Sequence, residues 1–442
     1  MSARTIRRQP VETGVSGWEA LAPRRFPARA LEGGQSADWL IVGAGFGGLS
    51  AARRLRQLRP QDRIVVLDAQ EVAIGAAGRN SGFMIDVPHN LTSGNYSVGG
   101  AASSLLEISQ NRMAIAFAAG IAEEYGMPAT TFDPSGKINA AATERGLRLN
   151  RDFARSLRQI GEPSETLDAA QMREITGSDY YLGGVRTPGA VMIQPADYIR
   201  RLAAGLAGEV DLFENSPVLS LGRKGAVWEA VSTRGSVQAP RVILAVNGHV
   251  ESFGHFRRRL IHVYTYASMT AAFPGGAGAE RWALLPADPM GATLRKISHG
   301  GQSRIVVRTH FTYNPDIRVS ERQVARIAAQ ERRSFDERFP ALKSVPMEFS
   351  WAGALCLSTN HVPAFGEIEP GLYSACCENG LGTVKSTLAG MMAAELATGT
   401  DSESLRQFRR QPPPARLPPE PIAWLGIHSV IRWHQLRAGR EG

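Results

Sequence analysis

The sequence predicts an α/β protein in which a Rossmann-like dinucleotide-binding domain is interleaved with an α+β domain built on an antiparallel sheet. Two apolar runs predict the first domain: residues 38–42 end in Gly-x-Gly-x-x-Gly, and residues 64–67 end on Asp68. Alternating strand patterns predict the second domain, and they lie near residues 183–191, 261–271 and 304–310. A chain of 442 residues, 43% of them hydrophobic, is long enough for two cores.

The glycine turn begins the predicted dinucleotide site. Gly43 allows the sharp turn, Gly45 lets the backbone approach a pyrophosphate, and Gly48 lets the following helix pack closely on the strand. That helix is predicted over residues 49–58, and its first N–H groups suit phosphates. Asp68 stands twenty residues after Gly48, where a carboxylate can accept hydrogen bonds from both ribose hydroxyls. The alternative is a glycine-rich turn in some other α/β unit.

A segment of small residues, 75–84, follows the second strand and contains Arg79-Asn80-Ser81-Gly82. Its glycines let backbone lie flat against a large ligand, and the guanidinium fork of Arg79 suits a phosphate. With this Arg-Asn-x-Gly motif the chain resembles the D-amino-acid oxidase-like superfamily of flavoproteins, with its glycine, sarcosine and γ-glutamylputrescine oxidase types. The resemblance implies that the dinucleotide is FAD. Some relatives bind flavin covalently through a cysteine in the region that holds Cys356, but the register does not match, so FAD is predicted to be held without a covalent bond.

The resemblance covers most of residues 38–400 in order. A strand at 371–375, then Gly380-Leu381-Gly382 and a helix through residue 396, resemble the unit that closes the flavin site in the family. Residues 195–206 resemble its central helix, and residues 241–248 resemble the strand that passes under the cofactor. The motifs and the resemblance together imply these cofactor-binding residues: Gly43, Gly45, Phe46, Gly47, Gly48, Asp68, Ala69, Arg79, Asn80, Ser81, Gly82, Val218, Asn247, Gly248, Gly380, Leu381, Gly382 and Thr383.

Two positions depart from the family pattern. After Trp351-x-Gly353, the family carries Thr-x-Asp-x-x-Pro, but this chain has Asn360 in place of the acid. Sarcosine oxidases place an oxygen-activating lysine where this chain has Val384, and Lys385 follows one residue later. The expected electron acceptor is therefore oxygen or another electron carrier, and the departures favour the carrier.

The resemblance implies oxidation of a C–N bond in a small amine or amino acid, by hydride transfer to flavin and hydrolysis of the imine. Strands expected to face the flavin supply four candidate catalytic residues: His262, Tyr264, Arg308 and His310. His262 and Tyr264 alternate along one strand and Arg308 and His310 along another, so each pair is predicted to share a face. Arg308 would clamp a carboxylate or sulfonate, whereas an ordinary packed side chain is the alternative for each histidine. His89 is also expected to border the pocket.

Composition bounds the partners. The chain has 50 basic and 41 acidic residues, a net charge of +9, with much of the excess near the two ends. No basic helix with interleaved aromatic residues is present, so nucleic acid is not an expected partner. No run of about 20 apolar residues predicts a membrane span. Three cysteines without a disulfide framework, and no targeting signal, predict a cytoplasmic protein. No metal-ligand spacing is seen, so no metal site is predicted.

The predicted organisation is discontinuous. Residues 1–36 form a surface arm, residues 37–100, 195–255 and 352–400 form the FAD-binding domain, and residues 101–194 and 256–351 form the substrate domain. Residues 401–442 hold a proline-rich linker and an amphipathic tail, which docks on its own domain, on a partner or on a membrane. The alternative function is therefore an FAD-binding subunit of a hetero-oligomeric dehydrogenase, taurine-type for example, that is active only with a partner chain.

Overall fold

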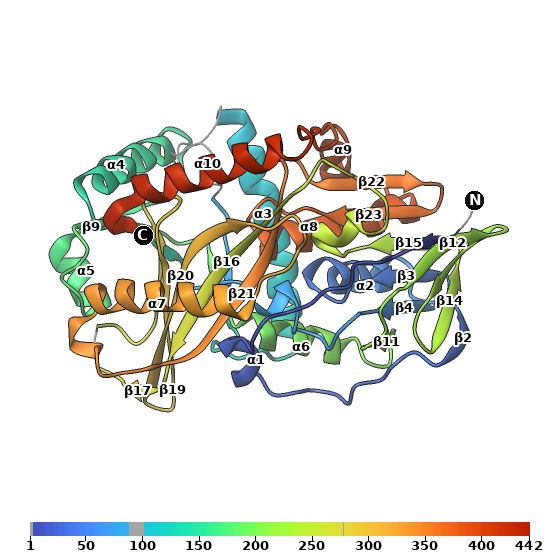
Figure 1. Ribbon diagram of the computed structural model, residues 1–442, viewed down its shortest axis with the longest axis horizontal. Helices are drawn as coiled ribbons and strands as arrows, with labels where there is room; N and C mark the ends of the chain where they lie inside the picture. The colour runs from blue at the N-terminus through green and yellow to red at the C-terminus, as the bar shows by residue number, and fades with distance from the viewer. Residues whose placement is uncertain (1–2, 88–100, 277) are drawn as a thin grey trace.

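The computed structural model describes residues 3–87, 101–276 and 278–442, and the side chains of residues 101–103 are outside the description. His89 therefore lies outside the described residues. Figure 1 shows a mixed α/β molecule, with a six-stranded sheet toward the right of the view and a larger, mainly antiparallel sheet toward the left. The α/β class and the Rossmann-like unit are as the sequence predicts.

The six-stranded sheet is formed by segments far apart in the chain. Its order is β11 (Asp211–Phe213), β4 (Ile64–Leu67), β3 (Trp39–Val42), β15 (Arg241–Leu244), β23 (Leu372–Cys376) and β22 (Ala364–Glu369). Every pair is parallel except β22 with β23. β3 and β4 are buried along their whole length, which explains their unbroken apolar runs.

Two helices pack closely together beside this sheet. They are α2 (Phe46–Leu58), which follows the glycine turn, and α8 (Gly382–Thr398). A methyl group added to Gly390 would lie 2.0 Å from the carbonyl oxygen of Gly47, so only glycine permits this approach. The main packing partner of α3 (Ala101–Glu124) is α8, although its residues were assigned to the substrate domain.

The larger sheet carries the second half of the pocket described below. Its order is β21 (Met347–Leu357), β16 (Ile261–Thr270), β20 (Gln302–Tyr313), β19 (Thr293–His299), β18 (Trp282–Pro286), β7 (Lys137–Ala141), β9 (Gly183–Thr187) and β8 (Glu165–Asp168), and β17 (Phe273–Pro274) pairs with β20. Only β18 and β7 pair in parallel. The helices α4 (Glu144–Gln159), α5 (Ala169–Thr176) and α7 (Glu321–Arg338) belong to this half.

The strand predicted near residues 183–191 is two strands. β9 stays in the large sheet, whereas β10 (Val191–Ile193) pairs with β5 (Phe83–Met84) and β6 (Phe132–Asp133) in a small separate sheet. Pro188 and Gly189 lie between the two strands, where proline cannot donate to a ladder. α6 (Pro195–Gly205) then begins two residues after β10, close to its predicted position.

Residues 1–36, predicted as a surface arm and called the N-terminal arm below, are joined to distant parts of the chain at several points. β1 (Arg4–Thr5) pairs with β12 (Ser220–Lys224), and β2 (Gly33–Ser36) pairs with β14 (Gly235–Ala239), in a five-stranded sheet completed by β13 (Val227–Val231). Trp18, in the short helix α1 (Gly17–Leu21), is 0% exposed. Each short piece of this segment packs against a different distant part of the chain. The segment therefore shows no repeating pattern of hydrophobic residues that would predict a helix or a strand.

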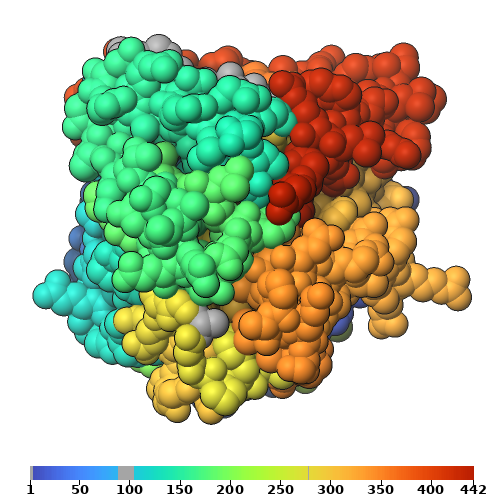
Figure 2. Space-filling model, turned by 90° about the vertical axis from the view of Figure 1, so that its left-hand side faces the viewer, coloured from blue at the N-terminus to red at the C-terminus, as the bar shows by residue number. Residues whose placement is uncertain are grey.

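The C-terminal tail forms a helix on the outside of the large sheet. After α9 (Glu403–Arg409) and an extended proline-rich stretch, α10 (Ile422–Ala438) lies against β20. Gln435 Nε2 donates to the carbonyl oxygen of Phe311 at 3.0 Å, and Tyr313 donates to Glu420 at 2.9 Å. Figure 2 shows this red C-terminal segment beside the green region that contains α4 and the orange region that contains α7. No helix in the described ranges is long and apolar enough to cross a membrane.

Candidate cofactor and substrate site

One large pocket is lined from both sheets. Loops that follow the carboxyl ends of β3, β4, β15 and β23 line one side, and residues of β16, β19, β20 and β21 line the other. The empty space is about 2090 Å³, including the part that opens to solvent. The carboxyl edge of parallel strands is where α/β sheets bind ligands.

The glycine turn after β3 lines the side of the pocket that is formed by the six-stranded sheet. Gly43 has φ of 104°, and a methyl group on it would lie 2.5 Å from the carbonyl oxygen of Ala245. Gly45, Phe46 and Gly47 line the pocket at the start of α2, where no side chain from the described residues caps the helix. Their N–H groups and the positive end of the helix dipole therefore face the pocket.

Gly48 and Gly82 do not line the pocket. A methyl group on Gly48 would lie 1.7 Å from the carbonyl oxygen of Gly43, so Gly48 serves the packing of helix on strand. Gly82 has φ of 77°, and a methyl group there would lie 2.4 Å from the carbonyl oxygen of Ile193. Both glycines allow close packing of the backbone next to the residues that line the pocket.

Asp68 presents a carboxylate to the pocket from the end of β4. One oxygen accepts from the N–H of Ala44 at 2.7 Å, and the other accepts from the N–H of Gln70 at 2.9 Å. A carboxylate has about four acceptor positions, so Asp68 keeps capacity to accept from a ligand hydroxyl. Burial raises the pKa of Asp68 to about 6, although these backbone donors oppose that rise.

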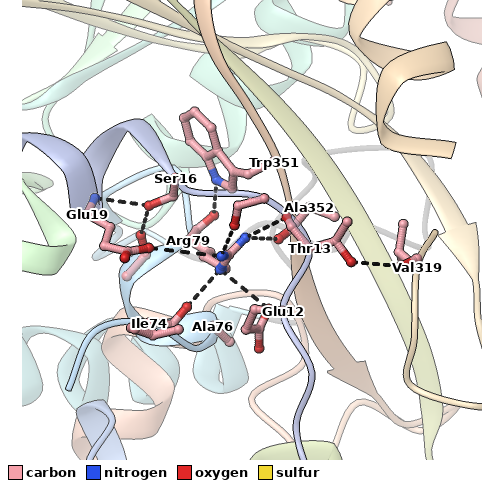
Figure 3. Close-up of polar contacts among 12 residues, drawn as sticks. Glu12, Thr13, Ser16, Glu19, Ile74, Ala76, Arg79, Val319, Trp351 and Ala352 are labelled. Carbon is pink, nitrogen blue, oxygen red and sulfur yellow. Dashed lines mark hydrogen bonds and ion pairs between the residues drawn. The ribbon is translucent and has the colours of Figure 1, made fainter. Parts of the chain in front are cut away.

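Arg79 does not present its guanidinium to a phosphate as the sequence suggests. Its side chain is 2% exposed, and its nitrogens donate to the carbonyl oxygens of Ile74 at 2.7 Å, Thr13 at 3.1 Å, Ala352 at 3.3 Å and Gly14. Figure 3 shows the guanidinium among these acceptors. Arg79 lines the pocket, but its donors connect segment 75–84 to the N-terminal arm and to β21.

The rest of segment 75–84, called the flavin loop here, is fixed by hydrogen bonds within it and from β21. Asn80 Oδ1 accepts from the N–H of Gly82 at 2.8 Å, and its amide donates to the carbonyl oxygen of Ala77 at 2.7 Å. Trp351 Nε1 donates to the carbonyl oxygen of Arg79 at 3.0 Å. Asn80 and Ser81 both line the pocket.

A second helix N-terminus completes the first side. Gly380, Leu381, Gly382 and Thr383 line the pocket at the start of α8, which also has no side-chain cap among the described residues. The predicted residues Ala69, Val218, Asn247 and Gly248 line the pocket as well.

Asn360, and Lys385 beside the departing position Val384, make contacts within the chain. Lys385 Nζ pairs with Glu107 on α3 and does not line the pocket. Asn360 donates to the carbonyl oxygen of Pro413 at 3.1 Å and accepts from the N–H of Ala415 at 3.0 Å. Asn360 therefore fixes the proline-rich linker.

Arg308 is the charged residue of the opposite side. Thr265, Thr293 and Arg308 line the pocket from β16, β19 and β20. Arg308 is paired with Thr293 across the strands, and its Nη1 lies 3.4 Å from Thr293 Oγ1. Its guanidinium also lies 4.7 Å from the ring centre of Phe311.

The prediction that Arg308 and His310 share a face is wrong. Thr265 pairs with Phe311 and Tyr266 pairs with Thr309, so His310 is the extra residue of a β-bulge, with φ of 51°. Its Nδ1 lies 2.7 Å from Thr309 Oγ1, and it does not line the pocket. Burial, with Arg326 and Arg333 of α7 nearby, lowers the pKa of His310.

His262 and Tyr264 both line the pocket and both are buried. His262 Nε2 lies 2.6 Å from a carboxylate oxygen of Glu251, which the sequence analysis did not single out. Burial raises the pKa of Tyr264. Glu251 ends the short 3-10 helix Asn247–Glu251, which begins with the predicted residues Asn247 and Gly248. This nearness in sequence is the one local indication that Glu251 lies by the pocket.

The N-terminal arm contributes residues that no sequence pattern indicated. Arg8, Gln9, Pro10 and Glu12 line the pocket. All lie outside the motifs and precede the first predicted strand. Their place depends on contacts with residues hundreds of positions away.

The described part of the site contains neither a pocket-lining cysteine nor a metal-ligand cluster. Cys356, Cys376 and Cys377 are free and buried, and none lines the pocket. Among the described residues, no group of three or more His, Cys, Asp or Glu side chains is arranged to hold a metal ion.

Comparisons with known proteins identify the family. The family described as FAD dependent oxidoreductase (DAO) matches residues 38–396. The chain is 25% identical to the probable oxidoreductase OrdL of Rhizobium meliloti, over 90% of this chain and 92% of the relative. It is 24% identical to the gamma-glutamylputrescine oxidoreductase of Escherichia coli, with the same two coverages.

Solved structures show the same fold. Glycine oxidase from Geobacillus kaustophilus superposes with a TM-score of 0.69 at 20% identity, over 84% of this chain and 96% of that one. An L-amino acid deaminase from Proteus myxofaciens superposes with a TM-score of 0.68 at 14% identity, over 91% and 98%.

Proposed function

The chain belongs to the family of FAD dependent oxidoreductases, and from that premise we propose that it oxidises the C–N bond of a small amine or amino acid. The observation that carries the proposal is that a single pocket is lined by sixteen of the eighteen predicted cofactor residues and also by His262, Tyr264 and Arg308. A substrate held by these side chains lies in the same cavity as the cofactor.

The cofactor residues fit FAD chemically. Two helix N-termini without side-chain caps suit the pyrophosphate and the electron-rich edge of the flavin. The remaining acceptor positions of Asp68 suit ribose hydroxyls. Bound FAD supplies the acceptor for a hydride.

The chain's own residues orient the substrate and handle its proton. Arg308 would bind an anionic end, a carboxylate or sulfonate, through two parallel hydrogen bonds. An ammonium group must lose a proton before the neighbouring carbon can give up a hydride. His262, fixed by Glu251, is the residue we propose to take that proton, and buried Tyr264 would help to desolvate the amine.

The names of similar proteins support the substrate class. Gamma-glutamylputrescine, glycine and L-amino acids all carry nitrogen on an oxidisable carbon. The contact of Lys385 with Glu107 supports an electron carrier over oxygen as the acceptor. The reduced flavin would then be reoxidised slowly in air.

The test is anaerobic bleaching of the flavin absorbance by a panel of amines, amino acids and sulfonates. We expect at least one nitrogen-bearing compound to bleach it, and a 2-hydroxy acid of the same size to leave it unchanged. Reoxidation is then timed with air and with an artificial electron acceptor. Bleaching by 2-hydroxy acids alone would contradict the proposal.

One observation favours the second candidate, an FAD-binding subunit that acts with a partner chain. The outward side of α10 exposes large apolar side chains: Ile422 (61%), Leu425 (58%), Trp433 (54%) and Leu436 (73%). Apolar patches of this kind mark interaction sites. This candidate predicts that bleaching requires a co-expressed chain and that both chains elute together in gel filtration.

A further inference from the structure

We propose that Glu12 is part of the cofactor site, where its carboxylate binds a sugar hydroxyl of FAD, and that the N-terminal arm is a wall of that site. The matched family range begins at residue 38, so the arm lies outside it. Glu12 would bind the cofactor in this way whichever substrate the protein oxidises.

Hydrogen bonds hold the arm on both sides of its pocket-lining residues. At its start, Ile6 N–H donates to the carbonyl oxygen of Leu219 at 2.8 Å, and Gln9 Nε2 donates to that of Val218 at 3.0 Å. At its end, Thr13 Oγ1 donates to the carbonyl oxygen of Val319 at 2.7 Å, and Arg79 donates to that of Thr13. Glu12 is thus placed by anchors on both sides of it.

Glu12 is a buried carboxylate that faces the pocket. Its side chain is 10% exposed, and Oε2 lies 3.4 Å from Arg79 Nε (Figure 3). The N–H groups of Arg79 are directed at carbonyl oxygens, so Glu12 Oε2 has a charge partner but no hydrogen bond within the described residues. A buried oxygen without a donor is costly, and a donor from the ligand would remove that cost.

The surroundings of Glu12 select the kind of donor. A methyl group on Gly75 would lie 3.8 Å from Glu12 Oε1, and Asp68 and Glu19 lie near enough to raise its pKa. These acids disfavour a phosphate at Glu12, whereas an uncharged hydroxyl can donate there. Burial is the main cause that raises the pKa of Glu12, to about 7, and Arg79 opposes it.

FAD offers such hydroxyls on its ribose and on its ribityl chain. Asp68 lines the same pocket as Glu12 and keeps capacity to accept, so the two carboxylates would bind different hydroxyls of the cofactor. The experiment must distinguish a ribose hydroxyl from a ribityl hydroxyl as the partner of Glu12.

The test compares Glu12 with Glu19, which is also an acidic neighbour of Arg79, at 4.0 Å, but does not line the pocket. The dissociation constant of FAD is measured by flavin fluorescence for Glu12→Ala, Glu12→Gln and Glu19→Ala without any substrate. We expect increases of at least tenfold for Glu12→Ala, about threefold or more for the isosteric Glu12→Gln, and less than twofold for Glu19→Ala.

Binding of ADP to flavin-stripped protein distinguishes the hydroxyls. If Glu12 binds the ribose, ADP loses affinity in parallel with FAD; if it binds the ribityl chain, only FAD loses affinity. Unchanged FAD affinity in both Glu12 variants would overturn the proposal and leave an ammonium of the substrate as the partner. Equal losses in Glu12→Ala and Glu19→Ala would overturn it in favour of a purely structural effect on Arg79.

Discussion

The two sides of the pocket are built in different ways. The side predicted to hold the cofactor uses backbone: glycine turns at 43–48 and 380–382 bring N–H groups and helix ends to the pocket. The substrate side uses single side chains from strands, among them Thr265, Thr293 and Arg308. A turn depends on a few consecutive residues, whereas the direction of a strand side chain depends on register. The sequence therefore predicts the turns closely, and on the strands it predicts three of the four pocket-lining candidates but not the bulge that displaces His310.

The largest expected effect is that of a substitution in the glycine turn, on the side of the pocket built from backbone. Gly48→Ala places a methyl group 1.7 Å from a backbone oxygen that cannot move aside easily. We expect a loss of about 3 kcal/mol or more in the free energy of unfolding, the upper end for overpacking, and little bound flavin. Urea unfolding and the flavin absorbance of purified protein measure both. Gly120→Ala is the control, because its methyl group would meet nothing within 4 Å.

The next effect concerns the carboxylate at the end of β4. Asp68→Ala removes acceptors that we assign to ribose hydroxyls, and hydrogen bonds to charged groups contribute about 1.5–3 kcal/mol. We expect the dissociation constant of FAD to rise at least tenfold. Asp38→Ala is the matched control, since Asp38 also accepts from a backbone N–H, that of Arg63 at 2.8 Å, but does not line the pocket. Equal affinities in the two variants would mean that Asp68 does not hold the cofactor.

A smaller effect tests the side-chain wall. Arg308→Ala should raise the half-saturation concentration of an anionic substrate about tenfold or more, and Arg308→Lys should raise it less, because lysine keeps the charge but loses the fork. Flavin content should stay normal in both. His310→Ala should change neither quantity, because the bulge turns His310 away from the pocket. Stopped-flow reduction of the flavin gives the values, and an effect of His310 equal to that of Arg308 would contradict the assignment.

The smallest effect concerns the far face of the same sheet. Glu331 of α7 accepts from Ser268 Oγ at 2.6 Å and from the N–H of Thr309 at 3.1 Å. Burial raises its pKa from 4.5 to about 8, so the folded state binds the proton more tightly than the unfolded state. Stability should therefore fall as the pH rises from about 4.5 to 8.

Glu331→Gln cannot lose a proton, so its stability should fall less over this range than that of the unaltered protein. Urea midpoints at pH 5 and pH 8.5 give the difference, with Glu337→Gln, on an exposed position of the same helix, as the control. An identical pH dependence in all three proteins would show that Glu331 is ionised in the fold.

Much of the fold follows from local patterns. The strand, glycine turn, helix and second strand lie at β3, α2 and β4 within two or three residues of their predicted bounds, because buried runs and glycine turns are local signals. Family membership confirms FAD as the cofactor and the α/β fold class. The assignment of individual cofactor and catalytic residues stays a prediction, although sixteen of the eighteen predicted cofactor residues, all but Gly48 and Gly82, line the pocket.

The sequence by itself determined where the backbone turns toward a dinucleotide and which residue types stand there. Only the tertiary structure decided the direction of Arg79, the bulge at His310 and the position of Glu12. Each of these depends on partners remote in the chain: carbonyl oxygens of Thr13 and Ala352 for Arg79, the pairing of β16 with β20 for His310, and anchors at Val218 and Val319 for the arm. Hydrogen bonds between distant segments set these directions, and a single sequence carries no local signal of which segments will meet.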